Sequence, residues 1–368
     1  MMNNYKERIN SLKEVIRQNN ISLAIIPPSP NLRYLTGYNG HQDERFFGFF
    51  IPKDGEPFLI APELAKPQTE IMPVSEKLFY KDGEDPYQII LSVLNDRELS
   101  SNKILVDNSL NASFLLPIQR IFIQSEFELA DNILKELRIC KDHEEIKALK
   151  DAGELTDKVL GEVLSQQNWI AKTERDLALS LEFKLRNCGM EGVSFAPIVA
   201  CGSNGATPHH KCGDTTIKEG IPIVIDFGGV YHGYASDMTR TVVFGEPDEE
   251  VKKVYTIVKQ ANEEAKKIVR PGIEAEKIDI VARKVIEEAG YGENFIHRTG
   301  HGIGMETHEA PMIVEGNKRL LKPGMTFSIE PGIYLPGKFG VRLEDIVVVT
   351  KNGIDSINNY PKELIQPI

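Results

Sequence analysis

Residues 222–241 read PIVIDFGGVYHGYASDMTRT, and much of the architecture can be inferred from them. An apolar run carries one acid, Asp226, and the chain returns after a Tyr-His-Gly turn with a second acid, Asp237. This pattern predicts a β-hairpin. A two-residue loop at 231–232 pairs the two acids directly, and a loop at 232–233 makes them diagonal neighbours. In either register both carboxylates lie on one face, about 5–8 Å apart at Cβ.

Two carboxylates this close on an apolar surface repel each other, so we expect a cation between them. A second predicted hairpin repeats the arrangement, because a turn centred on Gly337 places Glu330 opposite Glu344. His301 lies between two glycines, in a turn where we expect it to be exposed enough to act as a ligand. Four carboxylates and one imidazole suit two divalent cations with mainly oxygen ligands. Two such ions, about 3.5 Å apart, can share a hydroxide and polarise a carbonyl.

The region around these hairpins contains an internal repeat. Residues 156–189 and 257–290 are equal in length and align without a gap. Each predicts a long amphipathic helix, a short break and a second helix that ends on glycine, Gly189 or Gly290. An apolar strand and a glycine-rich turn follow in both copies. We interpret this pattern as a duplicated unit of two helices, a strand and a glycine-rich turn.

The first third of the chain predicts an α/β unit, because short apolar strands alternate with helices and favour a mixed sheet. We place the domain boundary where a charged helical connector begins, which gives an N-terminal domain at 1–130 and a C-terminal domain at 131–368. The helices are expected at about 4–19 and 86–95, and the strands at 21–26, 46–51, 58–60 and 103–106.

Composition limits the classes of function. The chain has 368 residues and a net charge of −11, with 41% hydrophobic and 26% charged residues, which is typical of a soluble globular protein of two domains. The acidic balance argues against nucleic acid or anionic membranes as partners. The four cysteines form no C-x-x-C pair, which suits a reducing compartment. The sequence shows no signal peptide and no membrane span, so we expect a cytoplasmic location.

Five stretches of the C-terminal part resemble the motif set of the M24 metallopeptidases, the pita-bread enzymes. Within the family they resemble the proline-specific branch, Xaa-Pro dipeptidase (prolidase) and Xaa-Pro aminopeptidase. The resemblance covers about residues 133–368, and the first third resembles the smaller creatinase-like domain of that branch. It implies an α+β chain in which a pita-bread catalytic domain follows an α/β creatinase-like domain. The stretches are 225–228, 236–241, 300–304, 329–332 and 341–345.

The resemblance also implies a ligand set for two divalent metal ions. Asp226 chelates one metal, Asp237 and Glu344 bridge both, and His301 and Glu330 bind the second. Members of the family use Mn, Co or Zn, and oxygen-rich ligation favours Mn in a cell.

Further residues of this sequence match positions near the family's substrate site. The resemblance implies that His209 and His308 donate hydrogen bonds to the developing oxyanion. His297 matches a position near the substrate pocket. Arg342 precedes Glu344 by two residues and so points to the same strand face, where we expect it to pair with a ligand carboxylate or to orient substrate.

The function implied is hydrolysis of the peptide bond before proline through a metal-bridged hydroxide, with Glu330 moving the proton to the leaving nitrogen. Prolidase, which cleaves Xaa-Pro dipeptides, is the preferred interpretation. An Xaa-Pro aminopeptidase acting on longer Xaa-Pro peptides is the alternative, and a non-catalytic pita-bread binding module is a remote third. A basic group that holds the proline carboxylate separates the first two. The polar segment 39–45 is a candidate for that group, reaching the partner's site in the homodimer that the resemblance implies.

Overall fold

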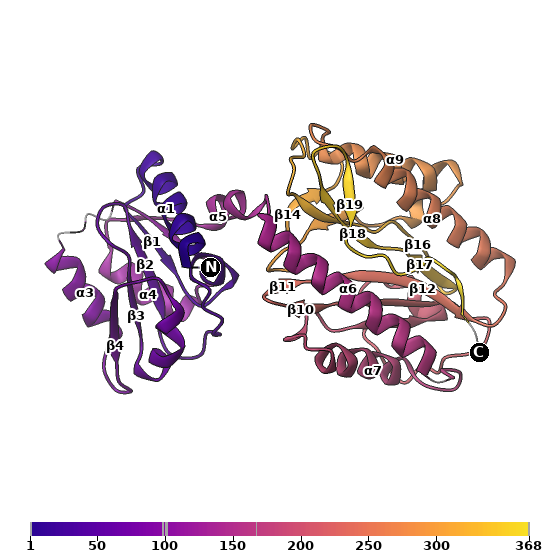
Figure 1. Cartoon of the computed structure of the whole chain (residues 1–368), viewed down its shortest axis with the longest axis horizontal. Helices are drawn as coiled ribbons and strands as arrows, with labels where there is room; N and C mark the ends of the chain where they lie inside the picture. Colours follow the sequence, from indigo (N-terminus) through magenta and orange to yellow (C-terminus); the bar gives the residue numbers. More distant parts are fainter. Residues whose placement is uncertain (1, 98, 100–101, 167, 367–368) are drawn as a thin grey trace. The chain divides into compact units, whose positions relative to one another are not determined.

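The computed structural model describes residues 2–97, 99, 102–166 and 168–366 (Figure 1). The chain divides into two compact units, which meet between Arg138 and Ile139.

The first unit is built on a mixed sheet with the strand order β4-β3-β2-β1-β5-β6. Strands β1 and β5 are parallel, whereas β1 and β2 are antiparallel, so the predicted mixed sheet is confirmed. The strands are β1 Leu23–Ile26, β2 Gly48–Pro52, β3 Phe58–Pro62, β4 Glu76–Tyr80, β5 Lys103–Val106 and β6 Glu126–Leu129. The helices are α1 Met2–Gln18, α2 Pro30–Thr36, η1 Glu63–Ile71, α3 Pro86–Asp96, α4 Ala112–Ile121 and α5 Asp131–Arg138.

Sequence patterns missed both edges of this sheet. Strands β4 and β6 read EKLFY and EFEL, and their charged residues hide the apolar run that identifies a buried strand. The segment 39–45 lies in this unit, where Arg45 contacts Asp43 and Asp82 at 3.2 and 2.8 Å. Its guanidinium is thus neutralised within its own unit.

The second unit contains two helix pairs in the predicted arrangement. The pairs are α6 His143–Gln166 with α7 Glu174–Asn187, and α8 Glu249–Ile268 with α9 Ala275–Glu288. Both pairs are followed by a left-handed glycine, Gly189 at φ +95° and Gly290 at φ +86°. An isolated bridge holds the start of the second helix in each copy, Thr173 to Thr216 and Glu274 to Leu320. The two copies therefore correspond in structure as they do in sequence.

Each helix pair covers its own sheet, with the helices outside and the sheets facing inward (Figure 1). Neighbouring strands are antiparallel except for β12 and β20, which pair in parallel. The first sheet has the order β20-β12-β9-β8 and packs on α6 and α7; the second has the order β14-β13-β15-β18-β19 and packs on α8 and α9. The strands of the first are β8 Ile198–Cys201, β9 Ile223–Phe227, β12 Met238–Phe244 and β20 Ile365–Gln366. Those of the second are β13 Gly300–Gly302, β14 Glu309–Ile313, β15 Thr326–Ile329, β18 Asp345–Val349 and β19 Ile354–Ser356. Smaller elements are β7 Gly192–Val193, η2 Gly202–Ala206, β10 Gly229–Tyr231, β11 Tyr234–Ala235, η3 Gly292–Asn294, β16 Gly332–Leu335 and β17 Phe339–Arg342.

The first hairpin adopts the second of the two predicted registers. Asp226 pairs with Thr239, so Asp237 is its diagonal neighbour. The turn residues His232 and Gly233 have φ values of +47° and +82°, as a tight hairpin with a two-residue loop requires.

The second hairpin also has the predicted register, but its strands are interrupted at the two acids. Ile329 pairs with Asp345 and Gly332 with Arg342, which leaves Glu330 facing Glu344 between these pairs. At the interruptions, the amide of Glu330 donates to Thr299 O at 2.8 Å and that of Glu344 donates to Thr239 O at 3.0 Å. The two acids are therefore positioned by neighbouring hairpins as well as by their own.

Among the described helices, none combines the length and the apolar character that crossing a bilayer requires.

Candidate metal centre

The five predicted ligands converge in the second unit. Single ligand atoms of Asp237, His301 and Glu344 lie within 4.8 Å of one another. The Nε2 atom of His301 is 3.6 Å from Asp237 Oδ2 and 3.3 Å from Glu330 Oε1. Asp226 lines the same cavity. The set thus combines side chains from both sheets, which lie up to 118 positions apart along the sequence from 226 to 344.

The carboxylates are arranged to receive cations. Asp226 Oδ1, Asp237 Oδ1 and Glu344 Oε1 are buried, and no described residue donates a hydrogen bond to them. Buried carboxylate oxygens without donors are costly unless a cation satisfies them. Oxygen-rich donor sets with one imidazole suit hard or borderline divalent ions, so these residues fit the metals that the sequence predicts.

The electrostatics of the cluster follow from burial. Desolvation, followed by repulsion from neighbouring carboxylates, raises the pKa values of Asp237 and Glu344 well above their ordinary range. Burial also raises the pKa of Glu330 to about 7. Without bound cations, the cluster therefore retains protons that a metal would displace.

His301 presents its Nε2 atom to the carboxylates. Its Nδ1 lies 3.1 Å from Gly302 O, so Nδ1–H donates to that carbonyl and leaves the Nε2 lone pair free for a metal. The expectation of an exposed turn was wrong, because His301 is only 3% exposed and lies in β13. The flanking glycines permit close strand contact instead. A Cβ atom on Gly300 would lie 1.9 Å from Ser328 O, and one on Gly302 would lie 2.2 Å from Ala310 O.

Hydroxyl groups orient the two glutamates. Ser328 Oγ donates to Glu330 Oε1 at 3.1 Å while accepting the amide of His301 at 3.0 Å. Thr239 Oγ1 donates to Glu344 Oε2 at 2.8 Å, which leaves Oε1 free. Neither hydroxyl was among the predicted site residues, because nothing local marks a serine or threonine that orients a distant acid.

Arg342 forms the ion pair with a ligand carboxylate that was one of its two predicted roles. Its Nη2 donates to Asp226 Oδ2 at 2.6 Å and its Nη1 donates to the Tyr334 hydroxyl at 2.9 Å. Nδ1–H of His297 donates to Arg298 O at 2.6 Å, so its Nε2 accepts from the Tyr334 hydroxyl at 2.8 Å. Sequence reasoning missed Tyr334, although Arg342 pairs with Gly332 and the hairpin register makes Tyr334 its diagonal neighbour.

The four carboxylates of the predicted ligand set line a cavity of about 1000 Å³. His209 and His308 both line it and are exposed. The rings of His308 and His301 meet edge to face, with centroids 4.2 Å apart. His210 Nε2 lies 2.8 Å from Oε2 of the buried Glu174. The same oxygen accepts the Gly213 amide, and Oε1 accepts the Cys201 amide, so His210 stabilises the loop that carries His209. Apolar lining comes from Phe195, Ile198, Ile296, Met312 and Val314.

A cation that the sequence did not identify also lines the cavity. Arg298 is half-buried, and no ion pair joins its guanidinium to any described carboxylate. Burial, followed by the charge of Arg298, lowers the pKa of His308, so the guanidinium lies near that ring. Lys211 also lines the cavity without a described ion pair, but it is exposed. An unpaired arginine beside a polar cavity is suited to bind an anionic group of a ligand.

Comparison with known families matches both units. Residues 147–351 match Metallopeptidase family M24, and residues 8–140 match the Creatinase/Prolidase N-terminal domain. The predicted fold class is thereby confirmed: an α+β chain with a pita-bread catalytic domain after a creatinase-like domain.

Relatives align along nearly the whole chain. An Xaa-Pro dipeptidase from Lactobacillus delbrueckii subsp. lactis is 36% identical over 97% of this chain and 98% of its own length. The recombinant prolidase of Thermococcus sibiricus is 42% identical, covers 99% of both chains and superposes with a TM-score of 0.94. The X-Pro aminopeptidase of Thermotoga maritima MSB8 is 34% identical over 96% of this chain and 99% of its own, with a TM-score of 0.84.

Proposed function

The chain belongs to metallopeptidase family M24 and is a metal-dependent peptidase, and on that premise we propose that it is a prolidase, which hydrolyses dipeptides of the Xaa-Pro type. Arg298 is the observation that carries the choice of dipeptides, because the half-buried cation lacks a described carboxylate partner beside the metal centre. A dipeptide places its free carboxylate one residue from the scissile bond, within reach of such a group. Relatives named prolidase and Xaa-Pro dipeptidase support the same assignment.

We assign the metal ligands as predicted. The assigned set is Asp226, Asp237, His301, Glu330 and Glu344, whose convergence and free oxygens support it. When bound, divalent ions supply a nucleophile at neutral pH and polarise the scissile carbonyl. Manganese is the ion we expect, with cobalt or zinc as alternatives.

The chain's own groups complete the reaction. Glu330 takes up a proton and delivers it to the leaving proline nitrogen. His209 and His308 donate ring N–H bonds to the carbonyl oxygen as it gains charge. His297 and Arg342 line the cavity on the Tyr334 side and help to position substrate. Because the amide nitrogen before a proline ring carries no hydrogen, recognition depends on shape, which apolar side chains such as Phe195 and Ile296 provide.

An Xaa-Pro aminopeptidase is the second candidate, and the size of the cavity favours it. About 1000 Å³ exceeds what a dipeptide needs and leaves room for a longer peptide. The non-catalytic binding module is disfavoured. Buried carboxylate oxygens without hydrogen-bond donors cost stability, and a protein that binds no metal would gain nothing from keeping them.

Side-by-side hydrolysis of Leu-Pro, Leu-Pro-amide and a Leu-Pro-Xaa tripeptide by the manganese-loaded protein tests the proposal. We expect Leu-Pro to be cleaved best. Arg298→Gln should raise KM for Leu-Pro by about 10–100-fold, the value of one charge-assisted contact, and leave hydrolysis of the amide unchanged. Lys211→Gln is the matched control, because it removes an exposed cation from the same cavity.

Other outcomes point elsewhere. Preferred cleavage of the tripeptide, with no effect of Arg298→Gln, would establish the aminopeptidase. Metal binding without cleavage of any of the three peptides would leave the binding module. The homodimer and the cytoplasmic location remain predictions. Sedimentation velocity can check the first, and cell fractionation can check the second.

A further inference from the structure

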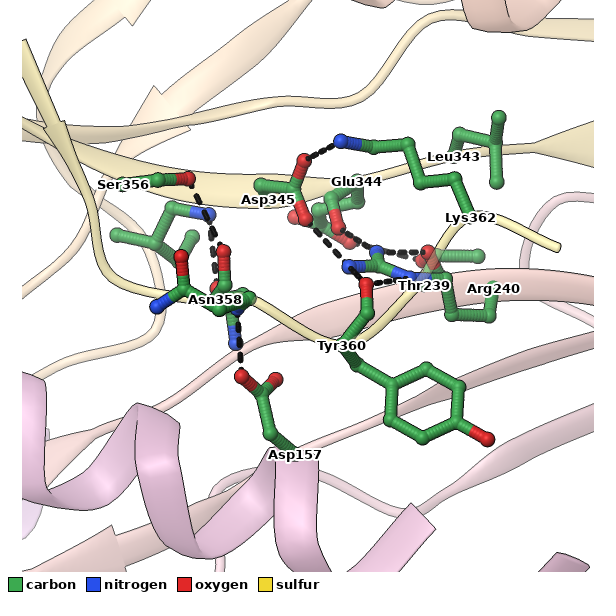
Figure 2. Close-up of polar contacts among 12 residues, drawn as sticks. Asp157, Thr239, Arg240, Leu343, Glu344, Asp345, Ser356, Asn358, Tyr360 and Lys362 are labelled. Carbon is green, nitrogen blue, oxygen red and sulfur yellow. Dashed lines mark hydrogen bonds and ion pairs between the residues drawn. The ribbon is translucent and has the colours of Figure 1, made fainter. Parts of the chain in front are cut away.

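A buried ion cluster directly follows the ligand Glu344. Asp345 is fully buried, and its Oδ1 accepts a hydrogen bond from Arg240 Nη2 at 2.6 Å (Figure 2). Its Oδ2 forms ion pairs with Lys362 Nζ, at 2.6 Å, and with Lys266 Nζ. None of these four residues lines the described cavity. The cluster therefore lies next to the proposed metal centre but outside the cavity proposed to bind substrate.

Arg240 links this cluster to the main chain of Glu344. It is 1% exposed and donates to the carbonyl oxygens of Glu344 at 2.6 Å, Thr239 at 2.9 Å and Tyr360 at 2.8 Å (Figure 2). The amide of Glu344 donates to Thr239 O, and its Oε2 accepts from Thr239 Oγ1. Amide, carbonyl and one carboxylate oxygen of Glu344 are thus all held, and Oε1 alone lacks a described donor.

Residues 356–364, which we call the strap, supply the contacts that Tyr360 makes with Arg240 and that Lys362 makes with Asp345. On the second sheet, the Ile357 amide donates to Ile346 O at 2.8 Å. On the first, the Val243 amide donates to Leu364 O at 2.7 Å. Between these ends the strap contributes Tyr360 O to Arg240 and Lys362 Nζ to Asp345. The strap therefore ties together the two sheets that supply the proposed ligands.

We propose that the strap is a positioning device for the metal centre, in which Arg240 and Lys362 are positioning residues that set Glu344 against the ligands of the other sheet. The inference rests on the ligand set of the proposed function. A bridging ligand must be held to within about 0.5 Å, and the groups that orient ligands typically change metal affinity by about 10–100-fold when removed. Glu344 lies where β17 passes into β18, so its own strands do not hold it there.

Lys362→Met is the principal test. The side chain of Lys362 is 19% exposed and Asp345 keeps Arg240 and Lys266, so we expect this variant to fold. Cobalt(II) is titrated into the metal-free full-length protein, followed by calorimetry and by visible absorption. We expect affinity about ten-fold weaker and an altered absorption spectrum, both restored by Lys362→Arg. Lys351→Met is the control, because Lys351 is exposed and has no described ion pair.

Arg240→Lys is a second variant. The lysine retains a positive charge for Asp345 but cannot donate to all three carbonyl oxygens, so we expect a larger loss of cobalt(II) affinity than in Lys362→Met. If it does not fold, Lys362→Met decides. A Lys362→Met protein with the affinity and spectrum of the parent overturns the inference, even if it unfolds at a lower temperature, because the strap would then be merely structural. If the parent protein does not bind cobalt, the proposed function fails first and this inference fails with it.

Discussion

Arg342 neutralises one oxygen of Asp226 and leaves the other to a cation. Its Nη2 lies 2.6 Å from Asp226 Oδ2, and Oδ1 is buried without a described donor. The side chains are only 3% and 12% exposed, so little solvent screens the pair. The arginine therefore leaves only Oδ1 of this proposed ligand free for a metal, and the same guanidinium donates to the Tyr334 hydroxyl at 2.9 Å.

Arg342→Met should destabilise the metal-free protein by about 3–5 kcal/mol, because it leaves a buried carboxylate without its counter-charge. Urea unfolding at pH 7 measures this loss. Arg298→Met is the matched control and should change stability by less than about 1 kcal/mol, since no described ion pair is broken. Equal losses in the two variants would show that the Asp226 pair contributes nothing specific.

Glu330→Gln should preserve the fold and lower kcat for Leu-Pro by at least 10²-fold, because an amide cannot carry the proton to the leaving nitrogen. Circular dichroism and steady-state kinetics check the two halves of this prediction. Glu315→Gln, on an exposed acid that does not line the cavity, is the control. Turnover near that of the parent protein would remove Glu330 from its assigned role.

The metal-free protein should lose stability as pH rises above about 6.5. The folded-state pKa values of Asp237, Glu330 and Glu344 are raised, that of Glu330 to about 7 from an ordinary 4.5, chiefly by burial. Each group binds more protons in the folded protein than in the unfolded chain while the pH lies between its two pKa values, so stability falls there with rising pH by up to about 1.4 kcal/mol per pH unit. The contribution of Glu330 is lost by about pH 7, and Asp237 and Glu344, whose pKa values are raised well above their ordinary range, cause the fall at higher pH.

The histidines oppose this trend only at lower pH. Burial lowers the pKa of His301 to about 3 and that of His297 to about 4, from an ordinary 6.5. The free energy of unfolding that the two histidines contribute therefore increases with pH and reaches its full value near pH 6.5. Thermal unfolding between pH 6.5 and 8.5 in the presence of a chelator tests the sign. Asp237→Asn should flatten the slope, and a slope of zero or above in the parent protein would contradict the prediction.

Gly300→Ala should cost about 3 kcal/mol or more and abolish tight metal binding. A Cβ atom there would lie 1.9 Å from the Ser328 carbonyl oxygen, so β13 and β15 would have to move apart and take His301 with them. Gly353→Ala is the control, because its Cβ would meet nothing within 4 Å, and we expect a change within about 0.5 kcal/mol. Unfolding and cobalt titrations of both variants measure the difference.

Local pattern was sufficient for both hairpins and for one of their registers. The apolar run around Asp226 and the turn before Asp237 predicted the first hairpin in either of two registers, and a turn at Gly337 predicted that Glu330 faces Glu344. These predictions succeeded because side-chain direction in a strand has a period of two and turn length then decides the pairing. The edge strands β4 and β6 were missed, since their charged residues give no such period.

The sequence by itself therefore determined the helix pairs, the two hairpins of the second unit, the acids that they carry and the proline-specific branch that its motifs resemble. Only the tertiary structure decided which carboxylate oxygens stay free, that Arg342 joins Asp226, that Arg298 faces the cavity unpaired, and that Lys362 reaches Asp345. These relations join residues far apart along the chain. Their distances depend on how the two sheets pack, which no local periodicity encodes.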